Sequence, residues 1–174
     1  MKQLGLILLT LLLNHNLTFS QTKSEIDSLL NAITKTETSK DIIKTVQAKR
    51  IINFGEKSLL TLSGFFTDST RTQVKSECHN RNITKGEIAI ILADRIEVMP
   101  YYTVTQIQNC LLTYCSNNPN KIEYYLGINN YLNNNEFKER YISWLFSKDR
   151  LKRVRGKKRK KRKRILSEWK NSSR

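Results

Sequence analysis

Hydrophobic residues recur at helical spacing along most of the chain between residues 21 and 150. The first set, Ile26, Leu29, Leu30 and Ile33, follows the i, i+3, i+4, i+7 pattern of a helix with one buried side. Similar sets lie in the ranges 41–53, 56–66, 84–99, 103–115, 122–132 and 137–145. No segment alternates polar and apolar residues for long, as a half-buried strand does. The pattern therefore predicts an all-α fold, a compact bundle of about six or seven short helices.

The clearest helix start in the chain lies at residue 84. The segment Thr84–Lys85–Gly86–Glu87 matches a capping box, in which a threonine at the N-cap and a glutamate three residues later bind each other's backbone N–H. Pro100 is predicted to end this helix, and Thr103 or Thr105 is expected to cap the next one.

The first twenty residues have the pattern of a secretory signal peptide. Lys2 precedes a short apolar run from Leu4 to Leu13, and small residues stand one and three positions before Gln21. The run spans about 15 Å as a helix, roughly half of a bilayer core. We therefore expect cleavage after Ser20 and export to the periplasm, the cell surface or the extracellular space.

Charge is concentrated at the C-terminus. The formal net charge is +16, of which residues 148–174 contribute +13 and residues 21–147 about +2. The chain thus divides into a signal peptide (1–20), a near-neutral helical domain (21–147) and a basic tail (148–174). Eight consecutive cations form the centre of this tail: Lys157, Lys158, Arg159, Lys160, Lys161, Arg162, Lys163 and Arg164. Because such a block repels itself, the tail is expected to be disordered, with a small apolar patch after it.

The eight cations are the candidate polyanion-binding residues. On an anionic membrane each basic residue contributes on the order of 1 kcal/mol. On nucleic acid the same residues would displace counterions and give salt-dependent binding without sequence reading. In a eukaryotic host the run is also typical of a nuclear-localisation signal. A tail that only raises solubility is the remaining alternative.

One stretch resembles a known repeat family. Phe54–Gly55–Glu56–Lys57–Ser58–Leu59–Leu60–Thr61–Leu62, followed by Phe66–Thr67–Asp68, is similar to the second helix of a HEAT repeat. The resemblance covers Asp41 to Thr70 in a single copy, whereas a solenoid shows its period several times. It implies HEAT-like helical hairpins with a surface for partners and no chemistry. The whole chain also resembles small exported bacterial proteins to which no activity is attached.

Three cysteines remain after the signal, and an oxidising compartment favours one disulfide among them. Cys110 and Cys115 lie too far apart to be bridged if their segment is helical. If 84–99 and 104–115 form an antiparallel helical hairpin, Cys78 lies nearer Cys115 than Cys110. The pairing Cys78–Cys115 is therefore predicted, with Cys78–Cys110 or no bridge as alternatives.

No set of residues predicts catalysis. Cys78, His79, Cys110 and Cys115 could supply four zinc ligands in number, but their spacing matches no zinc module, so neither a metal nor a cofactor is predicted. Glu87, Asp94 and Glu97 share one side of their helix, opposite the apolar set, and are expected to be solvated. The tyrosine pairs 101–102 and 124–125 are expected to pack in the core.

The sequence thus favours an exported, non-catalytic helical protein whose tail tethers it to an anionic membrane surface or another polyanion. The helical domain is a possible second surface, for a protein partner. One alternative is an envelope enzyme or enzyme inhibitor with its site on the helical domain. Another is a nucleic-acid-associated or host-targeted secreted protein.

Overall fold

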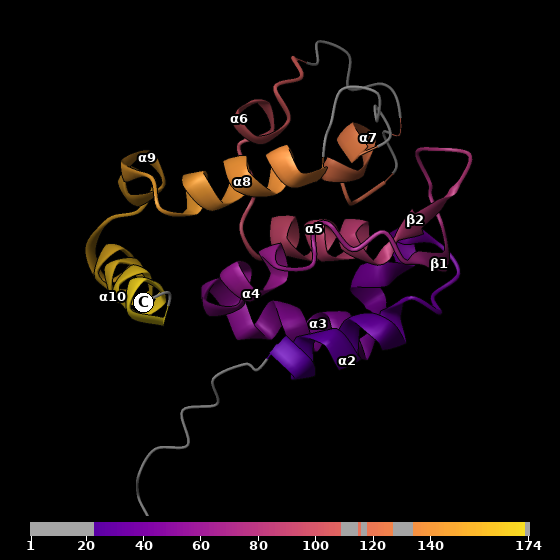
Figure 1. Ribbon diagram of the computed structural model, residues 1–174, viewed down its shortest axis with the longest axis horizontal. Helices are drawn as coiled ribbons and strands as arrows, with labels where there is room; N and C mark the ends of the chain where they lie inside the picture. The colour runs from indigo at the N-terminus through magenta and orange to yellow at the C-terminus, as the bar shows by residue number, and fades with distance from the viewer. Residues whose placement is uncertain (1–22, 109–114, 116–117, 127–133, 173–174) are drawn as a thin grey trace, which may run out of the picture.

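A computed structural model describes residues 23–108, 115, 118–126 and 134–172 (Figure 1). The predicted signal peptide and Cys110 lie outside these residues. Within them the protein is mostly helical, with one small sheet. No described helix is both long and apolar enough to cross a membrane.

The central element is helix α5 (Lys85–Ile96), which lies between two layers of shorter helices (Figure 1). Its residues from Ile88 to Ala93 are all at most 2% exposed. A helix that is apolar on every side needs neighbours on every side. One layer supplies α2 (Lys23–Ile33), the 3₁₀ turn η1 (Ser39–Lys44), α3 (Val46–Phe54), the 3₁₀ turn η2 (Gly55–Ser58) and α4 (Leu59–Ser63).

The predicted solvated face of α5 was wrong. Glu87 and Asp94 are only 7% and 5% exposed, and the side chain of Glu97 just past the helix is 13% exposed. Each carboxylate instead has fixed donors. Two layers cover α5, so the side opposite its apolar stripe is buried as well.

The start of α5 confirms the capping box. The hydroxyl of Thr84 accepts from the N–H of Glu87, and the Glu87 carboxylate accepts from the N–H of Thr84 at 2.7 Å. Gly86, in this first turn, lies against the chain that leaves α4. A Cβ at this position would lie 2.6 Å from the carbonyl oxygen of Phe66, so a side chain has no room there.

A two-stranded antiparallel sheet departs from the all-α prediction. Strand β1 (Arg71–Lys75) pairs with β2 (Asn82–Thr84), with Arg71 opposite Thr84. Thr72 and Val74 are buried while their neighbours on β1 are exposed, which is strand alternation. Five residues of alternation are too few to separate from a loop by pattern alone.

The second layer consists of α6 (Tyr101–Thr105), α7 (Ile122–Leu126) and α8 (Asn134–Leu145). The start of the helix predicted over 103–115 was wrong: α6 starts at Tyr101, directly after its N-cap Pro100, while residues 109–114 of the predicted helix lie outside the described part of the chain. Helix α6 ends at Thr105, and the left-handed φ of 60° at its C-cap Gln106 terminates the helix. The layers meet through aromatic rings, with Phe66 5.0 Å from Tyr141 between centroids.

The basic tail is not disordered. After α8 the chain forms α9 (Lys148–Lys152), capped by the Ser147 hydroxyl, and then α10 (Gly156–Ser172). Both lie at one end of the molecule (Figure 1). The side chains that hold α10 to the protein are Arg162, Ile165, Leu166 and Trp169, all at most 8% exposed. They follow the i, i+3, i+4, i+7 spacing of a docked helix, with an arginine in the first place.

The segment that resembles a HEAT repeat is helical in part. The helix expected over 56–66 consists of the 3₁₀ turn Gly55–Ser58 and the short α4. Gly55 has a φ of 67°, which separates α3 from this turn. The HEAT-like interpretation of Asp41 to Thr70 stays a prediction.

Candidate polyanion-binding site

Helix α10 displays seven of the eight predicted cations to solvent. We call these exposed residues the cationic face: Lys157, Lys158, Arg159, Lys160, Lys161, Lys163 and Arg164. They occupy just over two helical turns, about 10 Å along the axis. These seven charges therefore lie on a helix and not on the disordered tail that the sequence predicted.

Arg162, the eighth cation, has a different role. Its guanidinium forms a bidentate ion pair with Glu56 in η2, with both N···O distances 2.9 Å. A third contact of 2.9 Å reaches Glu97, and Nη1 donates to the carbonyl of Arg150 at 2.8 Å. Because these contacts lie between α10 and the rest of the protein, the Arg162 guanidinium is not available to an external anion, and its assignment to the binding site was wrong.

A second buried arginine completes the charge cluster. Arg150 on α9 is fully buried and donates to Glu97 through Nε at 3.0 Å and Nη2 at 2.7 Å. Its Nη2 also contacts Glu56 at 3.3 Å. The guanidinium lies over the rings of both Trp144 and Trp169, 5.6 and 5.8 Å from their centroids.

The cluster of Glu56, Glu97, Arg150 and Arg162 is electrically balanced. Two carboxylates face two guanidiniums, and the four residues come from η2, the end of α5, α9 and α10. Burial alone would raise the pKa of Glu56, yet the hydrogen bond and charge of Arg162, with Arg150 and Lys161, lower it below its usual value. Burial opposes the charge on Arg162, but Glu56 and Glu97 outweigh it and raise its pKa.

The apolar residues of α10 are used up by its docking. Ile165 is fully buried, and Leu166 and Trp169 are 7% and 8% exposed. The ring of Trp169 packs edge-on against Phe146, 5.8 Å away. The patch predicted to follow the basic block therefore belongs to the core, and polar and charged side chains make up the solvent side of α10.

The cysteine pairing is confirmed. Cys78 and Cys115 form a disulfide with a Cα–Cα distance of 5.2 Å. The helical hairpin used to predict it is not the reason, because α6 ends at Thr105. The bridge instead ties the loop after β1 to the segment before α7. With both sulfurs joined, Cys78 and Cys115 are not thiolates that could bind zinc, and Cys110 lies outside the described residues.

Beside the disulfide, Glu123 on α7 holds the loop in place. This fully buried carboxylate accepts from the hydroxyl of Ser76, the N–H of Glu77 at 3.0 Å and the side-chain amide of Asn118. The Nε2 atom of His79 lies 3.0 Å from the Glu123 carbonyl oxygen. The sequence pattern did not single out Glu123, because an acidic residue in a short helix carries no signal of burial.

Asp94 on α5 is another buried carboxyl. One oxygen accepts from the N–H of Met99 at 2.8 Å and the other from the hydroxyl of Tyr101 at 3.0 Å. Burial raises the pKa of Asp94, and these hydrogen bonds offset part of that effect. The contacts hold the chain between α5 and α6, and the Tyr101 ring packs at a tilt against Tyr125, 5.0 Å away between centroids. The expectation that both tyrosine pairs pack in the core was wrong for Tyr102, which is 62% exposed.

Comparisons with known proteins found no relationship. No family model matches the chain, and no curated protein or solved structure is similar to it. The functional argument therefore rests on the chemistry of its own residues, of which the cationic face is the most concentrated.

Proposed function

We propose that this protein is an exported, non-catalytic binding protein that attaches to an anionic partner through the cationic face of α10. The observation that carries the proposal is that the cations of one basic block have two different environments. Seven cations point to solvent, while Arg162 and three apolar residues fix the helix to the protein. A helix held in this way presents its charges without first paying the entropy of ordering a tail.

The strength of such binding depends on salt. Cations on the protein displace counterions from a polyanion, so affinity falls steeply as ionic strength rises. On an anionic bilayer each lysine or arginine near the surface contributes about 1 kcal/mol. Seven neighbouring cations are therefore enough for binding at low salt without any fitted pocket.

Export is part of the proposal. Residues 1–20 have the pattern of a signal peptide. The disulfide between Cys78 and Cys115 is compatible with an oxidising compartment. Outside the cytoplasm, a cationic face would meet anionic lipid headgroups and acidic polymers of the cell envelope.

The test needs substitutions rather than truncation. A chain ending at Ser147 would lose Arg150 and Arg162, leave Glu56 and Glu97 without these partners and expose the apolar surface on which α10 docks, so a loss of binding could reflect damage to the fold. The better variant replaces four exposed lysines of α10: K157Q, K160Q, K161Q and K163Q. A control with the same change of charge replaces four exposed lysines elsewhere: K35Q, K49Q, K75Q and K121Q.

Both variants are compared with the unmodified protein by the salt concentration that elutes each from immobilised heparin, a sulfated polyanion. We expect the α10 variant to elute at clearly lower salt than the control. Equal elution of the two variants would show that net charge alone governs binding, and the proposal would then be wrong.

A further inference from the structure

We infer that the anionic partner is a lipid bilayer surface, on which the protein docks through α9 and α10 together without inserting apolar side chains. This inference rests on the proposed function and names its partner. Three features carry it: the spread of positive charge over two helices, the pairing of the few acidic residues there, and the burial of the aromatic rings.

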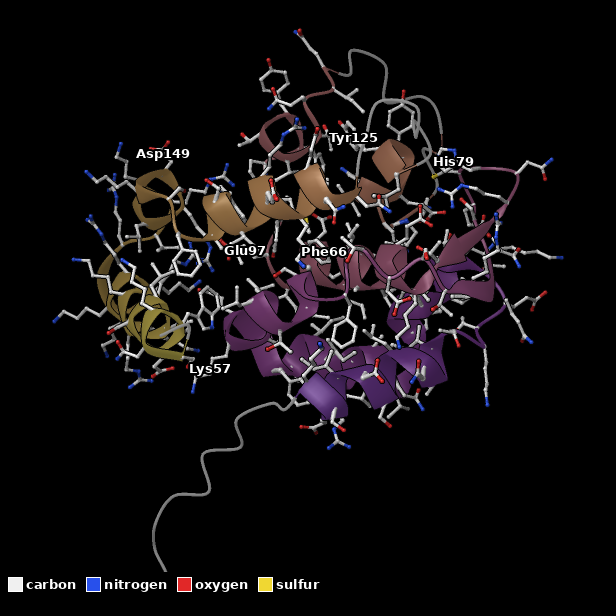
Figure 2. The ribbon with its side chains drawn as sticks, viewed as in Figure 1. Lys57, Phe66, His79, Glu97, Tyr125 and Asp149 are labelled. Atoms are coloured by element: carbon white, nitrogen blue, oxygen red, sulfur yellow. A yellow bond between two sulfur atoms is a disulfide. The ribbon has the colours of Figure 1, made fainter. Side chains whose placement is uncertain are left out.

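Positive charge extends beyond α10. Four further exposed cations lie on α9 and in the link to α10: Lys148, Lys152, Arg153 and Arg155. Together with the cationic face they form what we call the cationic end of the molecule. Figure 2 shows Asp149 on α9 and Lys57 beside α10 at this end, with His79 at the opposite end of the long axis. Because residues 21–147 carry only about +2, the charge is strongly one-sided and orients the molecule.

The acidic residues at this end do not interrupt the positive charge. Asp149 pairs with Lys152 at 3.1 Å, and Glu168 lies 3.6 Å from Arg164. Both pairs are exposed, so each neutralises one charge and leaves the remaining cations in excess. The cationic end thus has a net positive charge across both helices.

The width of the cationic end favours a flat surface over a groove. Figure 1 shows α9 above α10 at this end of the molecule, so their cations together extend beyond the width of a single helix, about 10–12 Å. The major groove of duplex DNA, about 12 Å wide, admits one helix. A bilayer has no such limit and can contact cations on both helices at once.

The apolar side chains exclude two other binding modes. Single-stranded nucleic acid is held by exposed aromatic rings on which bases stack. A helix that lies within the bilayer interface inserts tryptophan and leucine side chains. Trp144, Leu166 and Trp169 are at most 8% exposed and pack inside the protein, so docked α10 offers neither.

The experiment measures sedimentation with vesicles of phosphatidylcholine containing about one-third phosphatidylglycerol, against vesicles of phosphatidylcholine alone. The test variant changes the part of the cationic end outside α10: K148Q, K152Q and R155Q. Its control carries K35Q, K49Q and K121Q. Since each cation is worth about fivefold in partitioning, the test variant should bind roughly a hundredfold more weakly at low salt, and the control should bind like the unmodified protein.

A second measurement reports insertion. Lipids brominated along the acyl chain quench tryptophan only when the ring enters the hydrocarbon region. We expect vesicle binding without quenching, because Trp144 and Trp169 stay buried in the protein. Quenching on binding would show that α10 separates from the rest of the protein and inserts into the bilayer. The inference that the protein docks without inserting apolar side chains would then be wrong.

The outcomes separate this inference from the proposed function. Binding to heparin and to a short DNA duplex, without binding to anionic vesicles, overturns the bilayer and leaves the proposed function standing. If the test variant K148Q, K152Q and R155Q binds anionic vesicles as strongly as the unmodified protein, docking through both helices is overturned. Binding to none of these probes overturns both proposals.

Discussion

Replacing Arg162 with methionine should destabilise the docking of α10 while leaving the rest of the protein folded. Methionine keeps an unbranched side chain of similar helix propensity but removes the guanidinium and its charge. Glu56 and Glu97 would then share only Arg150. Removing one partner of a buried ion pair costs about 3–5 kcal/mol, and the partial exposure of Glu56 and its remaining contact with Arg150 put this case near the lower value.

A loss of about 3 kcal/mol corresponds to a roughly hundredfold rise in the equilibrium constant for local opening. Because α10 is at the C-terminus, and three apolar side chains and Arg162 supply most of its seat, this opening does not require the layers around α5 to separate. Hydrogen exchange read by mass spectrometry resolves the two regions. Protection of the amides in α10 should fall by about two orders of magnitude in R162M, while protection in α5 changes little.

The neighbouring substitution K161M is the matched control. It also replaces one cation with methionine, one residue away on the solvent side of the helix, where substitutions alter stability by about 0.5 kcal/mol or less. Its α10 protection should stay within about threefold of the unmodified protein. If R162M and K161M exchange alike, the buried charge cluster does not hold the helix, and the reasoning is refuted.

Three further predictions concern the rest of the fold. Replacing Cys78 and Cys115 with serine should lower the free energy of unfolding by about 2–4 kcal/mol in urea titrations, because the bridge closes a long loop; an unchanged midpoint would contradict this. G86A should destabilise by 1–3 kcal/mol or more in thermal unfolding, since its Cβ would lie 2.6 Å from a backbone oxygen, and a neutral effect would argue against that close approach. In carbon-13 NMR titrations the Asp94 carboxyl should titrate above 3.8 and that of Glu56 below 4.5. The ionised Glu56 carboxylate therefore stabilises the folded protein above the pKa that Glu56 has in the unfolded chain, and this contribution is lost as the pH falls through the pKa of Glu56 in the folded protein. For Asp94 the direction is reversed: its contribution declines as the pH rises from 3.8 through its pKa in the folded protein. Shifts in the opposite directions would contradict the structure.

The sequence by itself determined the local features. Most helices follow from the spacing of apolar residues, and the start of α5 follows from Thr84 and Glu87, because a capping box is complete within four residues. The pairing of Cys78 with Cys115 was also identified, although by a hairpin that α6 does not form. The exposed cations of α10 could be listed from the sequence as well.

Only the tertiary structure decided which charged side chains form ion pairs inside the protein and which face solvent. In the sequence Arg162 is one of eight consecutive cations, and nothing in the pattern distinguishes it from the others. Glu56 and Glu97 are separated from it by 106 and 65 residues. Their ion pairs exist because packing brings η2, α5, α9 and α10 to one point. A basic block is expected to be disordered when its charges have no counterions within the chain. Here the partly buried carboxylates of Glu56 and Glu97, together with the apolar contacts of α10, offset that repulsion, so the block folds as a helix and directs its remaining charges outward.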